Sequence, residues 1–165
     1  MLFTLSILYA FAIPHTFAIE PAIETAVLKG NWEALVNMLE KDDSKANDPV
    51  SRPIMAHAGL ATNRNNAAMM LFLSIGEEGD VTSWSDWTSS LLNKNPENPV
   101  ALYLHADAQA RSGNHSEAVQ LLTTATNLPS SPLSQNSSAG EIDSSEMVNY
   151  ALICNARGVL RMLTK

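Results

Sequence analysis

The sequence predicts an all-α protein built of antiparallel helical hairpins. Apolar residues recur at helical spacing in nearly every segment after residue 18, and no segment alternates apolar and polar residues as a strand would. Short turns rich in Gly or Asn separate these segments, and polar or Pro-rich stretches connect successive pairs. Hairpins repeated in this way are typical of a solenoid.

The composition favours a packed domain and argues against several classes of protein. The 165 residues are 45% hydrophobic and 16% charged, and 10 Lys+Arg against 17 Asp+Glu leave a formal net charge of −7. Nucleic-acid binding calls for clustered positive charge, so we expect no nucleic-acid partner. The single Cys excludes a disulfide framework within the chain and a multi-Cys zinc site.

Residues 1–18 predict a signal peptide. They contain no Asp, Glu, Lys or Arg, and their apolar run is shorter than the roughly 20 residues of a membrane span. Ala18 ends a fair match to a cleavage site, although the segment lacks the usual basic residue. We expect an exported protein, periplasmic or secreted. An uncleaved anchor, or a start codon placed upstream of a cytoplasmic protein, is the alternative.

Residues 19–48 predict a short N-terminal hairpin followed by a linker. Helices are expected at Glu20–Lys29 and Trp32–Glu40, with a Gly-Asn turn between them. In the second helix the apolar residues fall at i, i+3, i+4 and i+7, which makes one stripe: Trp32, Leu35, Val36 and Leu39. The charged and small residues at 41–48 indicate the linker.

Residues 49–127 predict helical repeats. Pro53 suits the first turn of a helix that runs through Ile54–Ala61, and Ala67–Ile75 follows an Asn-rich break. Val81–Lys94 is expected to be an extra helix. Its Trp84 and Trp87, like Trp32, are interpreted as core residues rather than as an aromatic binding patch.

The second half of this region predicts another hairpin, with helices at Val100–Ser112 and His115–Asn127 joined by a Gly-Asn turn. Residues 128–145 are rich in Ser, Pro, Gly and Asn and indicate a flexible exposed loop. Residues 146–165 predict a last helix.

The segment Ala101–Pro129 resembles a tetratricopeptide repeat. It reads ALYLHADAQARSGNHSEAVQLLTTATNLP, with small residues where two helices approach closely and a Gly at the turn. The matching positions are Ala106, Gly113, Glu117, Ala118, Leu122 and Ala125. His105 and Gln109 depart from the pattern, because the family prefers large apolar groups there.

Two further segments resemble the family less closely. In Pro49–Ile75, Ala56, Ala68 and Phe72 match, but the turn lacks Gly, and Ile153–Leu163 resembles the first helix of another repeat. The resemblance implies a right-handed α-solenoid. Because the last helix has no partner helix after it, we expect an incomplete repeat at 146–165 and a fragment or truncated member of the family.

No catalytic constellation is recognisable in the sequence. The four His have no metal-binding spacing, no Gly-rich phosphate loop is present, and Cys154 lies in an apolar helical run. We therefore expect no enzymatic activity, no metal and no small-molecule cofactor. An enzyme whose catalytic domain follows these repeats is the least favoured alternative.

The resemblance implies a concave groove lined by the first helix of each repeat. Carried onto this sequence, the groove positions are Tyr103, Asp107, Arg111, Asn155, Val159 and Met162. The first three are spaced by four, so they share one helix stripe. They suit peptide recognition, and Asp107 with Arg111 equally suits a simple ion pair within the helix.

These expectations favour a protein-interaction module that binds a partner protein or peptide in the groove. The alternative is a structural or assembly subunit of an envelope or secretion complex, which would be associated with a membrane. Neither function needs a cofactor.

Overall fold

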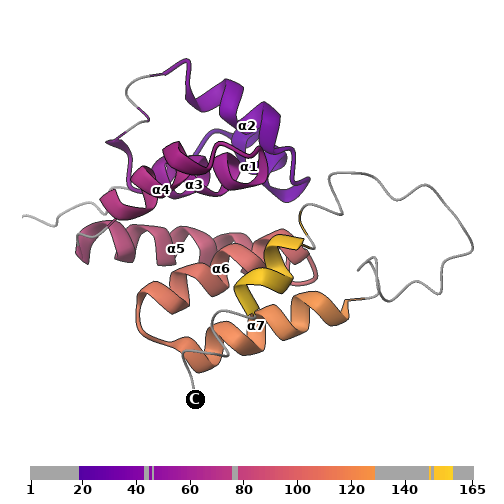
Figure 1. The fold of residues 1–165 in the computed structure, drawn as a ribbon. Helices are drawn as coiled ribbons and strands as arrows, with labels where there is room; N and C mark the ends of the chain where they lie inside the picture. The colour runs from indigo at the N-terminus through magenta and orange to yellow at the C-terminus, as the bar shows by residue number, and fades with distance from the viewer. Residues whose placement is uncertain are drawn as a thin grey trace, which may run out of the picture.

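The computed structural model describes residues 19–42, 45, 47–75, 78–128, 149 and 151–157, and these residues form helices and turns without a strand. The all-α prediction is therefore confirmed for this part of the chain (Figure 1). The helices are α1 (Pro21–Leu28), α2 (Trp32–Leu39), α3 (Ser51–Ala61), α4 (Asn65–Ser74), α5 (Glu78–Lys94), α6 (Pro99–Arg111) and α7 (His115–Asn127). Residues 151–157 are also helical, and with Asn149 we call them the C-terminal segment.

The same type of turn connects the two helices in each of three hairpins, α1–α2, α3–α4 and α6–α7. One residue of each turn has a positive φ: Gly30 at 62°, Asn63 at 60° and Gly113 at 83°. In each case its N–H donates to the carbonyl three residues back, and the next N–H donates to the carbonyl five residues back. This is a Schellman ending, which favours Gly or Asn at the left-handed position.

The helices form two groups, with α1–α4 above and α5–α7 below in Figure 1. Helix α3 packs on α2 and α4, whereas α6 packs on α5 and α7 and also contacts α1. The C-terminal segment joins the two groups. Trp32 Nε1 donates to Asn149 Oδ1 at 2.6 Å, and Arg157 Nη1 donates to Thr126 Oγ1 at 2.7 Å.

The core runs through both groups and includes large side chains from α2, α3, α5, α6 and α7. Ala106, Ala118 and Ala125, the small positions of the expected repeat, are fully buried, which allows α6 and α7 to approach closely. Gly59 fills the same need between α3 and α4, because a Cβ there would lie 3.0 Å from that of Ala68.

Helices α3, α4, α5 and α6 begin earlier than the sequence analysis predicted. Helix α4 begins at Asn65 rather than Ala67, and α6 begins at Pro99 rather than Val100. Helix α3 begins at Ser51, because Asp48 Oδ2 accepts from the backbone N–H of Ser51 at 2.6 Å and so caps the first turn. Helix α5 begins at Glu78 rather than Val81. Asp80 belongs to the first turn of α5 and forms an ion pair with Arg52 Nη1 at 2.9 Å. A carboxylate near the N-terminus of a helix also stabilises the helix through its dipole.

Several expectations fall outside the described residues. They are the signal peptide at 1–18 and nearly all of the loop at 128–145. In the last helix expected at 146–165, they are residues 146–148, 150 and 158–165, which include the groove positions Val159 and Met162. Within the part of the chain that is described, no helix has the length and apolar character needed to cross a membrane.

Candidate functional site

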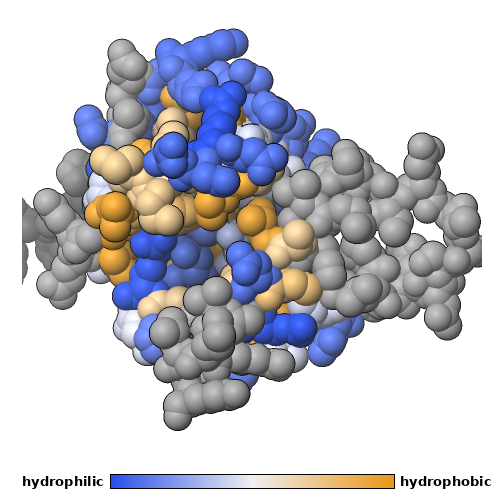
Figure 2. Space-filling view, viewed as in Figure 1, coloured by the Kyte–Doolittle hydropathy of each residue, from blue (hydrophilic) through white to orange (hydrophobic). Residues whose placement is uncertain are grey.

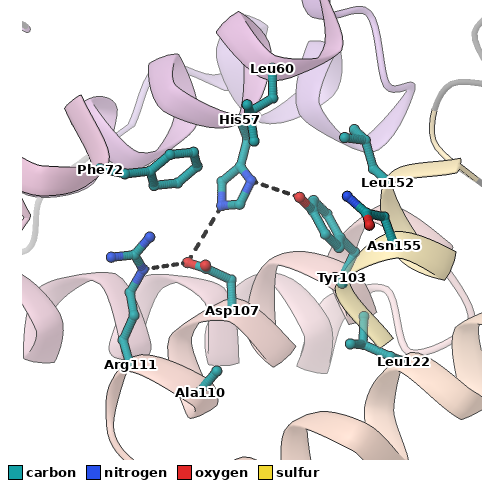
Figure 3. Close-up of a pocket in the computed structure, with 11 residues that line it drawn as sticks. His57, Leu60, Phe72, Tyr103, Asp107, Ala110, Arg111, Leu122, Leu152 and Asn155 are labelled. Carbon is teal, nitrogen blue, oxygen red and sulfur yellow. Dashed lines mark hydrogen bonds and ion pairs between the residues drawn. The ribbon is translucent and has the colours of Figure 1, made fainter. Parts of the chain in front are cut away.

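A partly open cavity of about 320 Å³ lies between the two groups of helices (Figure 3). Helices α3 and α4 form one wall, α6 and α7 form the opposite wall, and the C-terminal segment closes one side. The lining residues are His57, Leu60, Phe72, Tyr103, Asp107, Ala110, Arg111, Leu122, Leu152, Asn155 and Ala156. Most of them are apolar, and a few polar groups converge on the same space, as in ligand pockets generally.

Four of the six residues that the sequence analysis placed in a groove line this cavity. Tyr103, Asp107 and Arg111 come from successive turns of α6, and Asn155 comes from the C-terminal segment. The stripe with a spacing of four therefore faces the cavity. The structure brings these side chains together, and their role in binding a partner stays a prediction.

Asp107 is the centre of the polar contacts in the cavity. Its Oδ2 atom accepts from Arg111 Nε at 2.8 Å and from Trp84 Nε1 at 3.0 Å. The predicted ion pair between Asp107 and Arg111 is therefore confirmed. Burial alone would raise the pKa of Asp107, but the positive charges of His57 and Arg111 outweigh it and hold that pKa well below its ordinary value. The carboxylate is thus charged at neutral pH.

His57 connects α3 to α6 across the cavity. Its Nδ1 lies 2.9 Å from Tyr103 Oη, and its Nε2 lies 3.4 Å from Asp107 Oδ2. The second distance suits an ion pair, but the atoms are not aligned for a hydrogen bond. His57 Nε2 is buried, and no described residue accepts a hydrogen bond from it. A buried polar group costs free energy unless something pairs with it, and the Asp107 carboxylate is the group that pairs with Nε2.

Tyr103 is the hydrogen-bond partner of the imidazole on the other side of the ring. Burial raises the pKa of Tyr103, and the charge of Asp107 raises it further, so the side chain is a neutral phenol. The phenol can donate its hydrogen to His57 Nδ1. The edge of the ring that carries Nε2 is turned toward Asp107 in Figure 3.

Aromatic rings surround this cluster. Phe72 and Tyr103 meet the His57 ring edge to face, with centroids 5.1 and 5.0 Å away. The Arg111 guanidinium carbon lies 5.1 Å from the centroid of the Phe72 ring, a cation–π distance. Arg111 is therefore held by a carboxylate and by a ring, which fixes its planar group at the edge of the cavity.

A second buried histidine behaves differently. His105 Nδ1 lies 3.1 Å from Thr88 Oγ1, and its Nε2 lies 3.2 Å from Gln109 Nε2, so both ring nitrogens have partners. Burial lowers its pKa. The two departures from the repeat pattern thus pair with each other inside the fold. His115 Nδ1 also lacks a partner among the described residues, but it lies at the start of α7 and does not line the cavity.

The tryptophans belong to the core, as predicted. Trp32 and Trp84 are buried, and Trp87 is partly buried and stacks on Trp84 at 5.4 Å. Trp84 has a second role that the sequence analysis did not predict, because its indole N–H holds Asp107.

The sequence analysis missed His57 and Phe72 as site residues. Phe72 stood at an aromatic position of the weaker repeat, and His57 directly follows Ala56, a small position of the same repeat. That register could have placed both residues on one inner face. The described residues contain no group of three or more His, Cys, Asp or Glu side chains suited to a metal ion.

Exposed hydrophobic side chains border the cavity. Met69, Met70 and Leu73 on α4 are 56%, 69% and 73% exposed, and Phe72 of the same helix lines the cavity. Figure 2 shows hydrophobic side chains gathered over α4, beside a hollow between the two groups of helices. Exposed apolar patches of this kind mark interaction sites.

Comparison of the chain with models of protein families, with curated proteins and with solved structures gives no match. The resemblance to tetratricopeptide repeats therefore depends on the residues quoted above.

Proposed function

We propose that this chain is a protein-interaction module, a right-handed tetratricopeptide-like solenoid that binds a partner protein or peptide at the cavity between α3–α4 and α6–α7. The observation that carries the proposal is the convergence of Tyr103, Asp107, Arg111 and Asn155 on one apolar cavity. The common turn of the three hairpins supports the repeat architecture.

The border of the cavity favours a polypeptide over a small molecule. A volume of about 320 Å³ is at the small end of ligand pockets and accommodates one or two side chains. The exposed residues Met69, Met70 and Leu73 extend the apolar surface along α4 beyond it. A peptide that places one side chain in the cavity can cover these residues with the next ones.

Export to the periplasm or the medium remains part of the proposal, on the composition of residues 1–18. The protein is proposed to act without a cofactor and without catalysis of its own. The polar groups of the cavity suit recognition, because they are already paired with one another rather than poised beside a nucleophile.

A peptide array probed with the full chain tests this function. We expect Phe72→Ala and Arg111→Ala each to weaken capture of the bound peptides by about tenfold, the effect of losing roughly 1.4 kcal/mol of contact. Arg64→Ala is the matched control, because Arg64 pairs with Glu40 at the surface and does not line the cavity. Equal capture by all three variants would remove the cavity from the binding site.

Assembly into a larger envelope or secretion complex is the second candidate, and the exposed apolar face of α4 favours it. In this case a neighbouring subunit covers Met69, Met70 and Leu73, and the cavity stays free. Met70→Lys would then disrupt assembly, while Arg111→Ala would leave assembly unchanged.

A further inference from the structure

We infer that the C-terminal segment acts as a strap, so that its docking completes the binding cavity and the docking and the binding of a partner peptide stabilise each other. This inference deepens the proposed function and rests on it. The observation that carries it is that the segment supplies Leu152, Asn155 and Ala156 to the cavity and is held by residues from both groups of helices.

Three side chains anchor the C-terminal segment, one at each end and one in the middle. Asn149 Oδ1 accepts from Trp32 Nε1 of α2 at 2.6 Å. Arg157 Nη1 donates to Thr126 Oγ1 of α7 at 2.7 Å. Between them, Ile153 is 2% exposed and belongs to the core. Asn149, Ile153 and Arg157 are spaced by four, so one face of the segment bridges the upper and the lower group.

The turn of the first hairpin leaves room for this segment. A Cβ on Gly30 would lie 2.8 Å from Asn149 Cγ, well inside the roughly 3.5–4 Å at which carbon atoms pack. Gly113 has the matching place in the α6–α7 turn, also with a positive φ, and a Cβ there would meet nothing within 4 Å. The two glycines therefore serve the same kind of turn, and they differ in that Gly30 also contacts the C-terminal segment.

The neighbouring face of the segment forms one side of the cavity. Leu152 and Ala156 are spaced by four and are partly buried, and Asn155 lies beside them (Figure 3). If the segment leaves, the cavity loses this apolar wall and the Asn155 amide. A peptide in the cavity contacts these side chains only in the docked form, so it binds that form more tightly. By linkage, the bound peptide must favour docking to the same extent.

The docked state is held by contacts that a bound peptide can reinforce. In the sequence, residues 128–148 separate the segment from α7, so no short connection forces it into place. The anchors, one buried side chain and two hydrogen bonds, must offset the conformational entropy that the whole segment loses on docking. Segments of this kind open at a lower free energy than the core does.

The rate at which Cys154 reacts with N-ethylmaleimide tests the inference in the full chain. Cys154 is the single cysteine, it lies in the C-terminal segment, and it is partly buried. The thiol should therefore react faster when the segment is undocked, and the rate in urea gives the value for the free thiol. We expect the array peptide that the chain captures most strongly, added at saturation, to slow the reaction severalfold.

Two variants weaken docking at the Asn149 anchor. Gly30→Ala displaces the Asn149 carboxamide from Trp32, and Asn149→Ala removes the same hydrogen bond without backbone strain. In each, we expect Cys154 to react faster by up to about tenfold, the ratio for one lost hydrogen bond, and the peptide to bind more weakly by up to the same factor. Gly113→Ala is the matched control, because it has the same positive φ without the contact to Asn149.

Three results would overturn the inference, and they have different meanings. If Cys154 reacts at one rate in Gly30→Ala, Asn149→Ala and Gly113→Ala, the segment is not anchored in this way and the proposed function stands. If the peptide binds but leaves the Cys154 rate unchanged or raises it, docking and binding are not mutually stabilising, and the proposed function again stands. If the chain captures no array peptide, the proposed function fails and the inference fails with it.

Discussion

The hairpins α3–α4 and α6–α7 have the same turn but differ in what their second helix buries. Helix α4 buries Ala68 and exposes Met69, Met70 and Leu73. Helix α7 buries four residues, and Arg157 of the C-terminal segment bonds to one of them, Thr126. The same Schellman turn forms a hairpin in both places. How much of the second helix is buried depends on what packs against the hairpin, and Met69, Met70 and Leu73 of α4 have no cover among the described residues.

Matched Leu→Ala changes on the two second helices should show the largest contrast. Leu122→Ala removes a buried side chain from α7, and we expect a loss of about 2–5 kcal/mol in the free energy of unfolding. Leu73→Ala on α4 removes a side chain that is 73% exposed and should change it by less than about 0.5 kcal/mol. Urea denaturation followed by circular dichroism measures both, and similar losses would mean that α4 is covered in solution.

Asp107→Asn removes one polar link between the two hairpins, the ion pair of Asp107 with His57. It removes the charge that Arg111 and Trp84 hold, and we expect a loss of about 1.5–3 kcal/mol at pH 7. In the native chain the pKa of Asp107 lies below its ordinary value of 3.8. The stabilisation by the Asp107 carboxylate is therefore full when the pH is well above 3.8. It disappears as the pH falls through 3.8 toward the lower pKa of the native state.

Between about pH 5 and pH 2, the free energy of unfolding of Asp107→Asn should therefore fall less than that of the unmodified chain. Denaturation midpoints measured across that range give the difference, because the other carboxylates are common to both proteins. Parallel profiles would show that the Asp107 carboxylate is not stabilised by its neighbours.

The two turns offer a smaller contrast at their left-handed residues. Gly113→Ala places a Cβ in open space, so only the positive φ opposes it, at a cost of about 1 kcal/mol. Asn63→Gly makes the opposite change in the α3–α4 turn. It should leave stability within about 0.5 kcal/mol, because both residues tolerate this conformation. Thermal unfolding of both variants checks the sign, and a loss at Asn63 would reveal a side-chain role in that turn.

The local features of this fold could be predicted from the sequence, and the contacts between hairpins could not. Both ends of α7 were predicted, because Asn114 precedes it and its apolar spacing stops at Asn127. The stripe of Tyr103, Asp107 and Arg111 followed from a spacing of four within one helix. By contrast, His57 meets Tyr103 across 46 residues. That contact depends on how two hairpins cross, and no local periodicity specifies the crossing.

The same limit explains the early start of α5. The sequence analysis began this helix at Val81, because the residues before it are Gly and acidic residues that do not favour a helix. The partner that holds Asp80 is Arg52, 28 residues earlier, on α3. Long-range pairing thus extended one helix by a turn, just as it assembled the site.

The smallest effect on stability is expected on the exposed face of α4. Met70→Lys should change the free energy of unfolding by less than about 0.5 kcal/mol, since this side chain is 69% exposed. The same change should weaken capture of peptides that extend from the cavity onto α4, because a lysine there interrupts the apolar surface. Gln120→Lys, on the exposed side of α7, is the matched control. Unchanged capture by Met70→Lys would confine binding to the cavity and leave the α4 face to another subunit.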